Sequence, residues 1–254
     1  MCHPEAVQGS TSPDVERQEV TIDTGDGAMP AMLAQPPGAR VGAVLVVSDI
    51  FGRSPFYEGL AARLAASGFA ALVPEYFFRQ GPLAEVRIET AQARRAQLDE
   101  NRAQDDFLAA IDWLQKETGA SRVGTIGFCM GGTQVLDLAA RRQDLATACF
   151  YGFPARLPSA GPRTAPAPLE VVDAITGPIL GFWGDADAAV GMANVEELAR
   201  EMAARDVDFR YRIYPGLGHG FMAASRLDPD GPGYAESSEA WEETVQFLNQ
   251  HLRQ

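Results

Sequence analysis

The sequence predicts an α/β domain in which a mostly parallel, twisted sheet carries helices on both faces. From about residue 41 onward, apolar runs of strand length alternate with helical patterns. The segment VGAVLVVSDIFG, residues 41–52, is almost continuously apolar, as expected of a parallel strand buried on both faces. The chain has 254 residues, of which 46% are apolar, and this is enough to fill one large core. Strands and helices that alternate so regularly favour a parallel sheet with right-handed crossovers.

The predicted strands lie within residues 17–254, which we interpret as a single domain. Residues 1–16 are polar and lack periodicity, so we expect a flexible N-terminal tail there. After the strand at 41–52, similar apolar runs occupy residues 70–77, 122–128, 146–152, 178–184 and 209–216. The Pro-rich stretch 154–168 suits neither a helix nor a central strand. We expect a surface loop there, with a role at the edge of an active site as the alternative.

The predicted helices separate these strands. They occupy residues 54–70, the end of the polar stretch 84–117, a segment beginning near Gly132, residues 195–206 and the C-terminal stretch. Two of them show apolar side chains at helical spacing, namely Phe107, Ala110, Ile111 and Leu114, and Trp241, Val245, Leu248 and Leu252. Helices of this kind cover a sheet rather than stand alone.

Composition argues against several classes of partner. The formal net charge of −13 disfavours nucleic acid, because phosphate binding needs clustered Lys and Arg. No apolar run reaches the ~20 residues of a membrane-spanning helix, and the first residues do not resemble a secretory signal. Three cysteines, Cys2, Cys129 and Cys149, do not suggest a disulfide framework, so we expect a cytoplasmic protein. Both a monomer and a small homo-oligomer are compatible with the sequence.

A glycine-rich turn carries the candidate nucleophile. The strand at 122–128 runs into GFCMGG, residues 127–132, a G-x-C-x-G form of the nucleophile elbow centred on Cys129. The turn lifts the side chain clear of the sheet, and the N-terminus of the following helix favours a thiolate. A phosphate-binding turn is an alternative, but the P-loop lysine is absent. A buried structural cysteine is the other alternative, and it is our interpretation of Cys149, which lies in mid-strand.

The candidate base is one of only three histidines. His3 lies in the predicted tail, and His251 lies four residues from the C-terminus at the polar end of the last helix. His219 lies in the segment GLGHGF, directly after the final strand, with glycines on both sides. A loop of this kind can bring the imidazole to another strand end, so we predict His219 as the general base.

The candidate acid lies between nucleophile and base in the sequence, at the end of the strand 178–184. Two carboxylates are available there, Asp185 and Asp187. We predict Asp187 as the triad acid, because the later carboxylate of the turn reaches the His219 loop best. Asp185 is expected to stabilise the turn. The order Cys, Asp, His along the chain is that of the α/β-hydrolase fold.

Six motifs extend this pattern over most of the chain. They are DIFG (49–52), PEYFFRQG (74–81), IGFCMGG (126–132), FYG (150–152), GDADAAV (184–190) and GLGHGF (216–221). From about residue 18 to the C-terminus, the chain resembles the dienelactone hydrolase family. The resemblance implies hydrolysis of small lactones or activated esters, carboxylated or not, through a thioester on Cys129. It also implies that no metal or cofactor takes part.

The same resemblance implies roles for residues outside the triad. The backbone N–H groups of Met130 and Ile50 would form the oxyanion hole, which stabilises developing negative charge. Arg79 would meet a substrate carboxylate, with a surface salt bridge as the alternative. Phe51 and Tyr151 would lie at the substrate-binding site.

Three positions depart from the family pattern. The founding dienelactone hydrolases carry Glu where this chain has Asp49, Ser where it has Gly220 and Arg where it has Ala223; Arg226 is nearby but out of register. These departures weaken the expectation that dienelactone itself is the substrate. The resemblance implies that Asp49 holds the resting cysteine and gates its reactivity. The alternative is that it caps the turn that presents the Ile50 N–H.

A function of another class is a non-catalytic ligand-binding protein or receptor on an α/β-hydrolase scaffold. That function predicts a disrupted triad, whereas all three residues are present in the sequence. A redox role for Cys129 would need a C-x-x-C partner, which the sequence lacks. A zinc site built from Cys2, His3 and Cys149 would combine the tail with a buried strand, so we expect no metal site.

Overall fold

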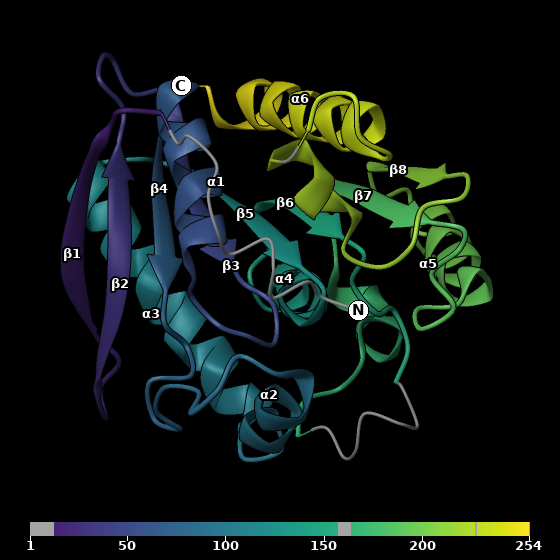
Figure 1. Cartoon of the computed structure of the whole chain (residues 1–254), viewed down its shortest axis with the longest axis horizontal. Helices are drawn as coiled ribbons and strands as arrows, with labels where there is room; N and C mark the ends of the chain where they lie inside the picture. Colours follow the sequence, from purple (N-terminus) through teal and green to yellow (C-terminus); the bar gives the residue numbers. More distant parts are fainter. Residues whose placement is uncertain (1–12, 157–163, 227, 254) are drawn as a thin grey trace.

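The computed structural model describes residues 13–156, 164–226 and 228–253. Its eight strands form one sheet in the order β1-β2-β4-β3-β5-β6-β7-β8 (Figure 1). The strands are β1 (Glu16–Asp23), β2 (Ala28–Gln35), β3 (Gly42–Val47), β4 (Phe69–Pro74), β5 (Val123–Phe128), β6 (Ala146–Phe150), β7 (Ile179–Gly184) and β8 (Phe209–Tyr214).

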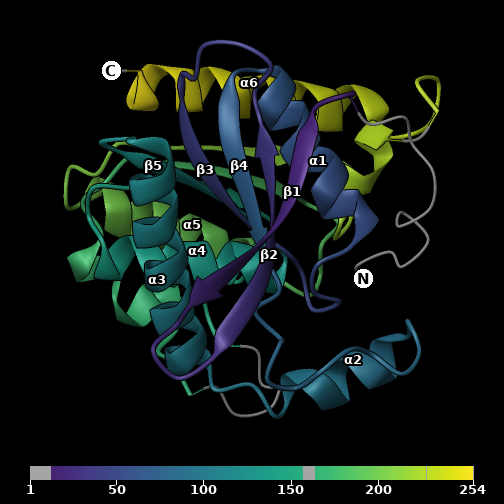
Figure 2. The ribbon, with the colours of Figure 1, turned by 90° about the vertical axis from the view of Figure 1, so that its left-hand side faces the viewer.

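The sheet is parallel from β4 through β8 and antiparallel only at one edge. β1 pairs antiparallel with β2, and β2 pairs antiparallel with β4. The other five pairings are parallel, and β3, β4, β5, β6 and β7 are buried along their whole length. The strands lie at different slants across the sheet, as its twist requires (Figure 2). The predicted mostly parallel, twisted sheet is therefore confirmed.

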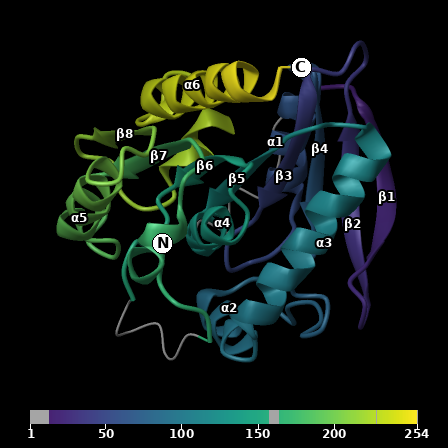
Figure 3. The same cartoon turned by 180° about the vertical axis from the view of Figure 1, so that it is seen from behind.

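Helices cover both faces of this sheet, as predicted. They are α1 (Pro55–Ala66), α2 (Ile88–Arg95), α3 (Glu100–Thr118), α4 (Met130–Arg141), α5 (Met192–Ala203) and α6 (Tyr234–Leu252), with short 3-10 turns η3 (Pro168–Glu170), η4 (Val172–Ala174) and η5 (Phe221–Arg226). α1 and α6 pack on one face, and α3 and α4 pack on the other (Figures 1 and 3). Within the described ranges, no helix combines the length and the apolar character needed to cross a bilayer.

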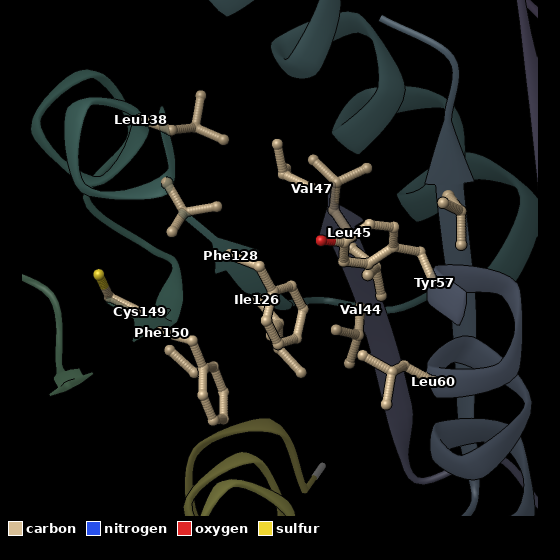
Figure 4. Close-up of a cluster of buried hydrophobic side chains, with 14 of the residues drawn as sticks. Val44, Leu45, Val47, Tyr57, Leu60, Ile126, Phe128, Leu138, Cys149 and Phe150 are labelled. Atoms are coloured by element: carbon tan, nitrogen blue, oxygen red, sulfur yellow. The ribbon is translucent and has the colours of Figure 1, made fainter. Parts of the chain in front are cut away.

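Apolar side chains fill the space between β5 and α1. Phe128 of β5 lies beside Tyr57 of α1 in Figure 4, with ring centroids 5.4 Å apart, and Ile126, Leu60 and Cys149 belong to the same buried cluster. Phe128 and Phe150 stack with their ring centroids 4.9 Å apart. Such a row of large side chains at the carboxyl ends of the strands gives the adjoining loops a rigid base.

Local signals set the ends of several helices. Pro55 occupies the first turn of α1, where its missing N–H costs nothing. The Asp99 carboxylate caps α3 by accepting from the N–H groups of Asn101 and Arg102, and the same helix ends at Gly119 with φ +69°. These are the signals by which sequence specifies where a helix begins and stops.

Two regions differ from the sequence-based expectation, the β1–β2 hairpin and α2. No strand was predicted before residue 41, yet β1 and β2 form a hairpin there. β1 is mostly exposed and shows no apolar alternation, so its pattern is weak. α2 lies within the stretch 84–117, of which only the last part was predicted to be helical. The predicted tail lies outside the described residues as far as residue 12, and Glu16 already belongs to β1.

Candidate active site

The candidate residues lie at one edge of the sheet. Cys129 follows β5, Asp187 follows β7 by three residues, and His219 lies five residues beyond β8. The DIFG segment, residues 49–52, follows β3. Because these strands are parallel, their carboxyl ends meet at the same edge, where open α/β sheets bind ligands. Topology therefore gathers residues that lie up to 170 positions apart in the chain (Figure 1).

The turn that holds Cys129 requires its glycines. A Cβ at Gly131 would overlap the carbonyl oxygens of Val47 and Ser48 at the end of β3. A Cβ at Gly127 would overlap the Gly131 carbonyl across the turn. Glycine at both positions lets β5 and α4 meet at a sharp angle with β3 alongside. The G-x-C-x-G pattern thus has a steric cause in the structure.

Cys129 itself has a backbone conformation that is rare for a side-chain-bearing residue. Its φ is +55°, and its N–H donates to the Phe150 carbonyl at 3.0 Å. Non-glycine residues held in this region store strain, which concentrates at functional sites. The side chain is 6% exposed, and α4 begins at the next residue, Met130. The thiol therefore sits at the N-terminus of a helix with only a small opening to solvent.

His219 connects Cys129 to Asp187. Its Nδ1 lies 2.6 Å from Oδ2 of Asp187, and its side chain is also hydrogen-bonded to Cys129. Since Nδ1 faces a carboxylate, we assign the proton there, which leaves Nε2 for the sulfur. The rings of Tyr151 and Phe153 lie 5.0 and 5.3 Å from the imidazole, centroid to centroid. The imidazole is therefore held in one orientation between its two polar partners.

The charges of this cluster support one another. Burial by itself lowers the pKa of His219, but Cys129 and Asp187 outweigh it and raise that pKa to about 9. Burial likewise opposes ionisation of Asp187, while its hydrogen bonds with His219, Val190 and Ala189 hold the pKa of the carboxyl below its usual value. The arrangement thus favours an imidazolium beside two acidic groups.

The two aspartates after β7 take different positions. Oδ1 of Asp187 accepts from the N–H groups of Ala189 and Val190, and its Oδ2 faces His219. Asp185 is exposed, and its Oδ1 accepts from the Gly216 N–H at 2.6 Å. Asp187 therefore has the geometry of a triad acid, and Asp185 joins the two loops that follow β7 and β8.

The DIFG segment forms a β-turn beside the nucleophile. The Gly52 N–H donates to the Asp49 carbonyl at 3.0 Å, and Gly52 has φ +78°. The Asp49 carboxylate accepts from the Phe51 N–H at 2.9 Å. This bond agrees with the turn-capping alternative for Asp49, and the gating of Cys129 by Asp49 stays a prediction. Ile50 and Phe51 are both buried, and the substrate role of Phe51 stays a prediction.

Arg79 forms ion pairs within the protein, and its predicted contact with a substrate carboxylate stays a prediction. Its Nη2 is 3.0 Å from Oδ1 of Asp106, its Nη1 pairs with the other oxygen of that carboxylate, and it also pairs with Asp26. The guanidinium carbon lies 4.2 Å from the ring centroid of Phe78. Asp106 is buried, so this ion pair neutralises a charge inside the protein. These contacts favour the salt-bridge alternative for Arg79, in a pair that is largely buried.

Sequence reasoning missed the arginine that does reach the site. Arg94 of α2 is buried; its Nη2 donates to the Ile50 carbonyl at 3.2 Å and its Nη1 to the Gly81 carbonyl at 3.3 Å. Its guanidinium also lies 4.0 Å from the ring centroid of Phe77. The available signal was its position three residues after the apolar Ala91, on the same face of a helix.

Tyr151 and the loop predicted at 154–168 are the remaining candidate positions near the site. Tyr151 is buried with φ +42°, beside His219, and its contact with substrate is still a prediction. The loop predicted at 154–168 lies partly outside the described residues, and in its described part the Pro154 carbonyl accepts from the Leu169 N–H. In the part of the chain that the structure describes, no three His, Cys, Asp or Glu side chains are grouped to hold a metal ion.

Several proteins are similar to this chain in sequence and in fold. The profile of the Dienelactone hydrolase family matches residues 29–252. Carboxymethylenebutenolidase from Rhodococcus opacus is 31% identical over 252 residues, 99% of this chain and 98% of its own. Carboxymethylenebutenolidase 2 from Cupriavidus pinatubonensis is 31% identical over 241 residues, 94% of each chain. A Klebsiella pneumoniae structure, provisionally described as a dienelactone hydrolase, matches with a TM-score of 0.84 at 24% identity, covering 94% of this chain and 100% of its own.

Proposed function

The chain belongs to the dienelactone hydrolase family and is a carboxylic ester or lactone hydrolase, and we propose that it acts through an acyl intermediate on Cys129. The observation that carries this mechanism is the hydrogen-bonded series Cys129, His219, Asp187 at the carboxyl edge of the sheet. A nucleophile, a base and an orienting acid in this order can perform acyl transfer without further groups.

In the first half of the reaction, Sγ of Cys129 attacks the carbonyl carbon of the substrate. The sulfur attacks as a thiolate, because its proton already lies on Nε2 of His219, and Asp187 stabilises that imidazolium. The carbonyl oxygen becomes an oxyanion, for which we propose the N–H groups of Met130 and Ile50 as donors. When the tetrahedral intermediate collapses, the bond to the leaving oxygen breaks and that oxygen takes the proton from His219. In a lactone, the leaving hydroxyl stays attached to the acyl group.

In the second half, water replaces the alcohol. His219 takes a proton from the water as its oxygen attacks the thioester carbon, and the same N–H groups stabilise the second oxyanion. Collapse breaks the carbon–sulfur bond, and the sulfur leaves as a thiolate beside the imidazolium. The product is a carboxylic acid, and the enzyme returns to its starting protonation state.

The preferred substrate is proposed to be an uncharged lactone or ester. Arg79, the residue expected to bind a substrate carboxylate, is held by Asp106 and Asp26. The groups next to His219 include the aromatic rings of Tyr151 and Phe153. Aromatic surfaces bind apolar groups well and provide no charge to offset a carboxylate. We therefore expect the enzyme to prefer neutral aryl esters and lactones to carboxylated ones.

A panel of lactones and aryl esters tests the activity. Wild-type enzyme should release product, and Cys129→Ala should reduce the rate to background while Cys149→Ala, the matched change at the other described cysteine, keeps it. Saturable binding of the same compounds without product release would contradict hydrolysis. That result would favour the ligand-binding alternative.

A further inference from the structure

Almost all backbone polar groups of the turn at residues 49–52 form hydrogen bonds within the protein. The Phe51 N–H donates to the Asp49 carboxylate, and the Gly52 N–H donates to the Asp49 carbonyl. The Ile50 carbonyl accepts from Arg94. The turn has three successive N–H groups, those of Ile50, Phe51 and Gly52. Among the described residues, only the Ile50 N–H has no hydrogen-bond acceptor. The turn is therefore built to leave one donor available at the active-site edge.

The peptide group that carries this N–H also accepts a hydrogen bond at its carbonyl end. The Ile50 N–H and the Asp49 carbonyl belong to the same planar peptide unit. The hydroxyl of Tyr76 donates to that Asp49 carbonyl at 2.8 Å, and the Ser48 carbonyl lies 3.2 Å from the same hydroxyl. A hydrogen bond to the carbonyl end of a peptide unit polarises the unit and strengthens its N–H as a donor.

We propose that Tyr76 is a positioning residue for the oxyanion hole, fixing and polarising the Asp49–Ile50 peptide unit so that the Ile50 N–H meets the developing oxyanion. This role rests on the proposed acyl transfer at Cys129. Tyr76 does not touch the substrate, and it acts only through the peptide unit. Tyr76 therefore affects the rates of the two steps in which a carbonyl oxygen gains negative charge.

The surroundings of Tyr76 suit such a role. The side chain is 1% exposed and packs against Phe77 and Phe107, with ring centroids 4.5 and 5.3 Å away, so the hydroxyl has little freedom to move. Burial, and the nearby Asp49 and Glu75, raise the pKa of Tyr76 well above its usual value. The phenol therefore keeps its proton, and remains a donor, at neutral pH.

Tyr76→Phe tests this role because it removes the hydroxyl and keeps the ring. The acylation rate constant, measured in the burst phase with an aryl ester, should fall about three- to tenfold, as expected for one lost hydrogen bond. This is less than the about 10²–10³-fold loss caused by removing an oxyanion donor outright. Substrate affinity should change little, since the ground-state carbonyl carries little charge.

A second reaction at the same sulfur separates positioning from a general structural effect. Methyl methanethiosulfonate transfers a CH₃S group to the Cys129 thiolate and releases methanesulfinate, so no carbonyl oxygen gains charge. Tyr76→Phe should leave the rate of this reaction unchanged. Tyr214→Phe, which removes the hydroxyl of another buried tyrosine, should leave both rates unchanged.

Each outcome decides the matter. An unchanged acylation rate in Tyr76→Phe, or an equal loss in acylation and thiosulfonate transfer, would overturn the positioning role and leave the proposed function intact. Absence of acylation in wild-type enzyme would overturn the proposed function and this role with it. If the variant is less stable, both rate constants are measured at a temperature at which circular dichroism shows it fully folded, because methyl methanethiosulfonate also modifies the thiols of unfolded protein.

Discussion

Replacing Asp187 with asparagine should trap His219 in the tautomer that cannot accept a proton from Cys129. Oδ1 of Asp187 accepts from the N–H groups of Ala189 and Val190, at 3.1 and 3.3 Å, and Oδ2 lies 2.6 Å from Nδ1 of His219. An asparagine must keep its carbonyl oxygen toward the two N–H groups, so its NH₂ group faces the imidazole. Nδ1 must then accept, and the proton of the neutral ring moves to Nε2, on the side of the sulfur.

The expected loss of turnover depends on how far the imidazole can still transfer protons in each variant. The wrong tautomer in a triad of this type costs about 10⁴-fold in turnover. Removal of the imidazole altogether, in His219→Ala, should cost more, about 10⁶-fold. The matched change Asp185→Asn keeps an oxygen for the Gly216 N–H, and an exposed hydrogen bond of this kind should alter turnover by no more than about threefold.

Initial rates with a saturating aryl ester, together with far-UV circular dichroism as a check on folding, measure all three variants. The expected order of activity is Asp185→Asn, then Asp187→Asn, then His219→Ala. If Asp185→Asn lost more activity than Asp187→Asn, the assignment of the triad acid would be wrong. A loss below tenfold in a folded Asp187→Asn would show that this carboxylate does not set the tautomer.

Three further outcomes are expected. Arg79→Ala should lower the melting temperature, because an unpaired buried Asp106 costs about 3–5 kcal/mol. The same variant should change KM equally for carboxylated and neutral substrates, and a selective rise in KM for the carboxylated substrate would contradict this. Gly131→Ala should destabilise the protein by about 1–3 kcal/mol in urea unfolding, since its Cβ overlaps two carbonyl oxygens, whereas Gly38→Ala meets nothing within 4 Å and should not. His219 has a pKa raised to about 9, so the stability that it contributes is fully present below about pH 6.5 and disappears as the pH rises through 9. If His219→Gln lost as much free energy of unfolding between these pH values as the wild type does, His219 would not be the source of the loss.

Much of the site could be predicted because its residues follow strands with strong apolar patterns. Parallel strands bring their carboxyl ends together, so Cys129, Asp187 and His219 could be expected to meet once their strands were recognised. The glycines at 127 and 131 marked the tight turn, and the structure gives the cause in their contact with each other and with β3. Glycine patterns of this kind encode backbone approach directly.

The roles of the arginines could not be predicted, because they depend on elements with weak patterns. Arg79 pairs with Asp26, which lies in the turn between β1 and β2, and with Asp106 on α3. The hairpin is exposed and aperiodic, so neither its existence nor its acidic turn was expected. Arg94 reaches the Ile50 carbonyl only because α2 packs there, and nothing in a short polar helix specifies that position.

The hydrogen bond of Tyr76 to the Asp49 carbonyl could not be predicted from the sequence either. The residue was assigned to a strand at 70–77, but β4 ends at Pro74 and Tyr76 lies in the turn beyond it. Its hydroxyl meets the Asp49 carbonyl because β3 and β4 are adjacent and parallel, with Leu45 opposite Leu72. Strand order and register are properties of the assembled sheet, so the contact between these two residues could not be inferred from their separate segments.

Direct detection of the acyl intermediate tests the central claim most sharply. Enzyme quenched in acid during the burst with a slowly hydrolysed aryl ester should gain the mass of one acyl group, and peptide mapping should place it on Cys129. Neutral hydroxylamine should remove it, as it cleaves a thioester. Cys149 is fully buried, and burial raises its pKa to about 12, so it should stay unmodified. Turnover without any adduct, or an acyl group on a residue other than Cys129, would contradict the account.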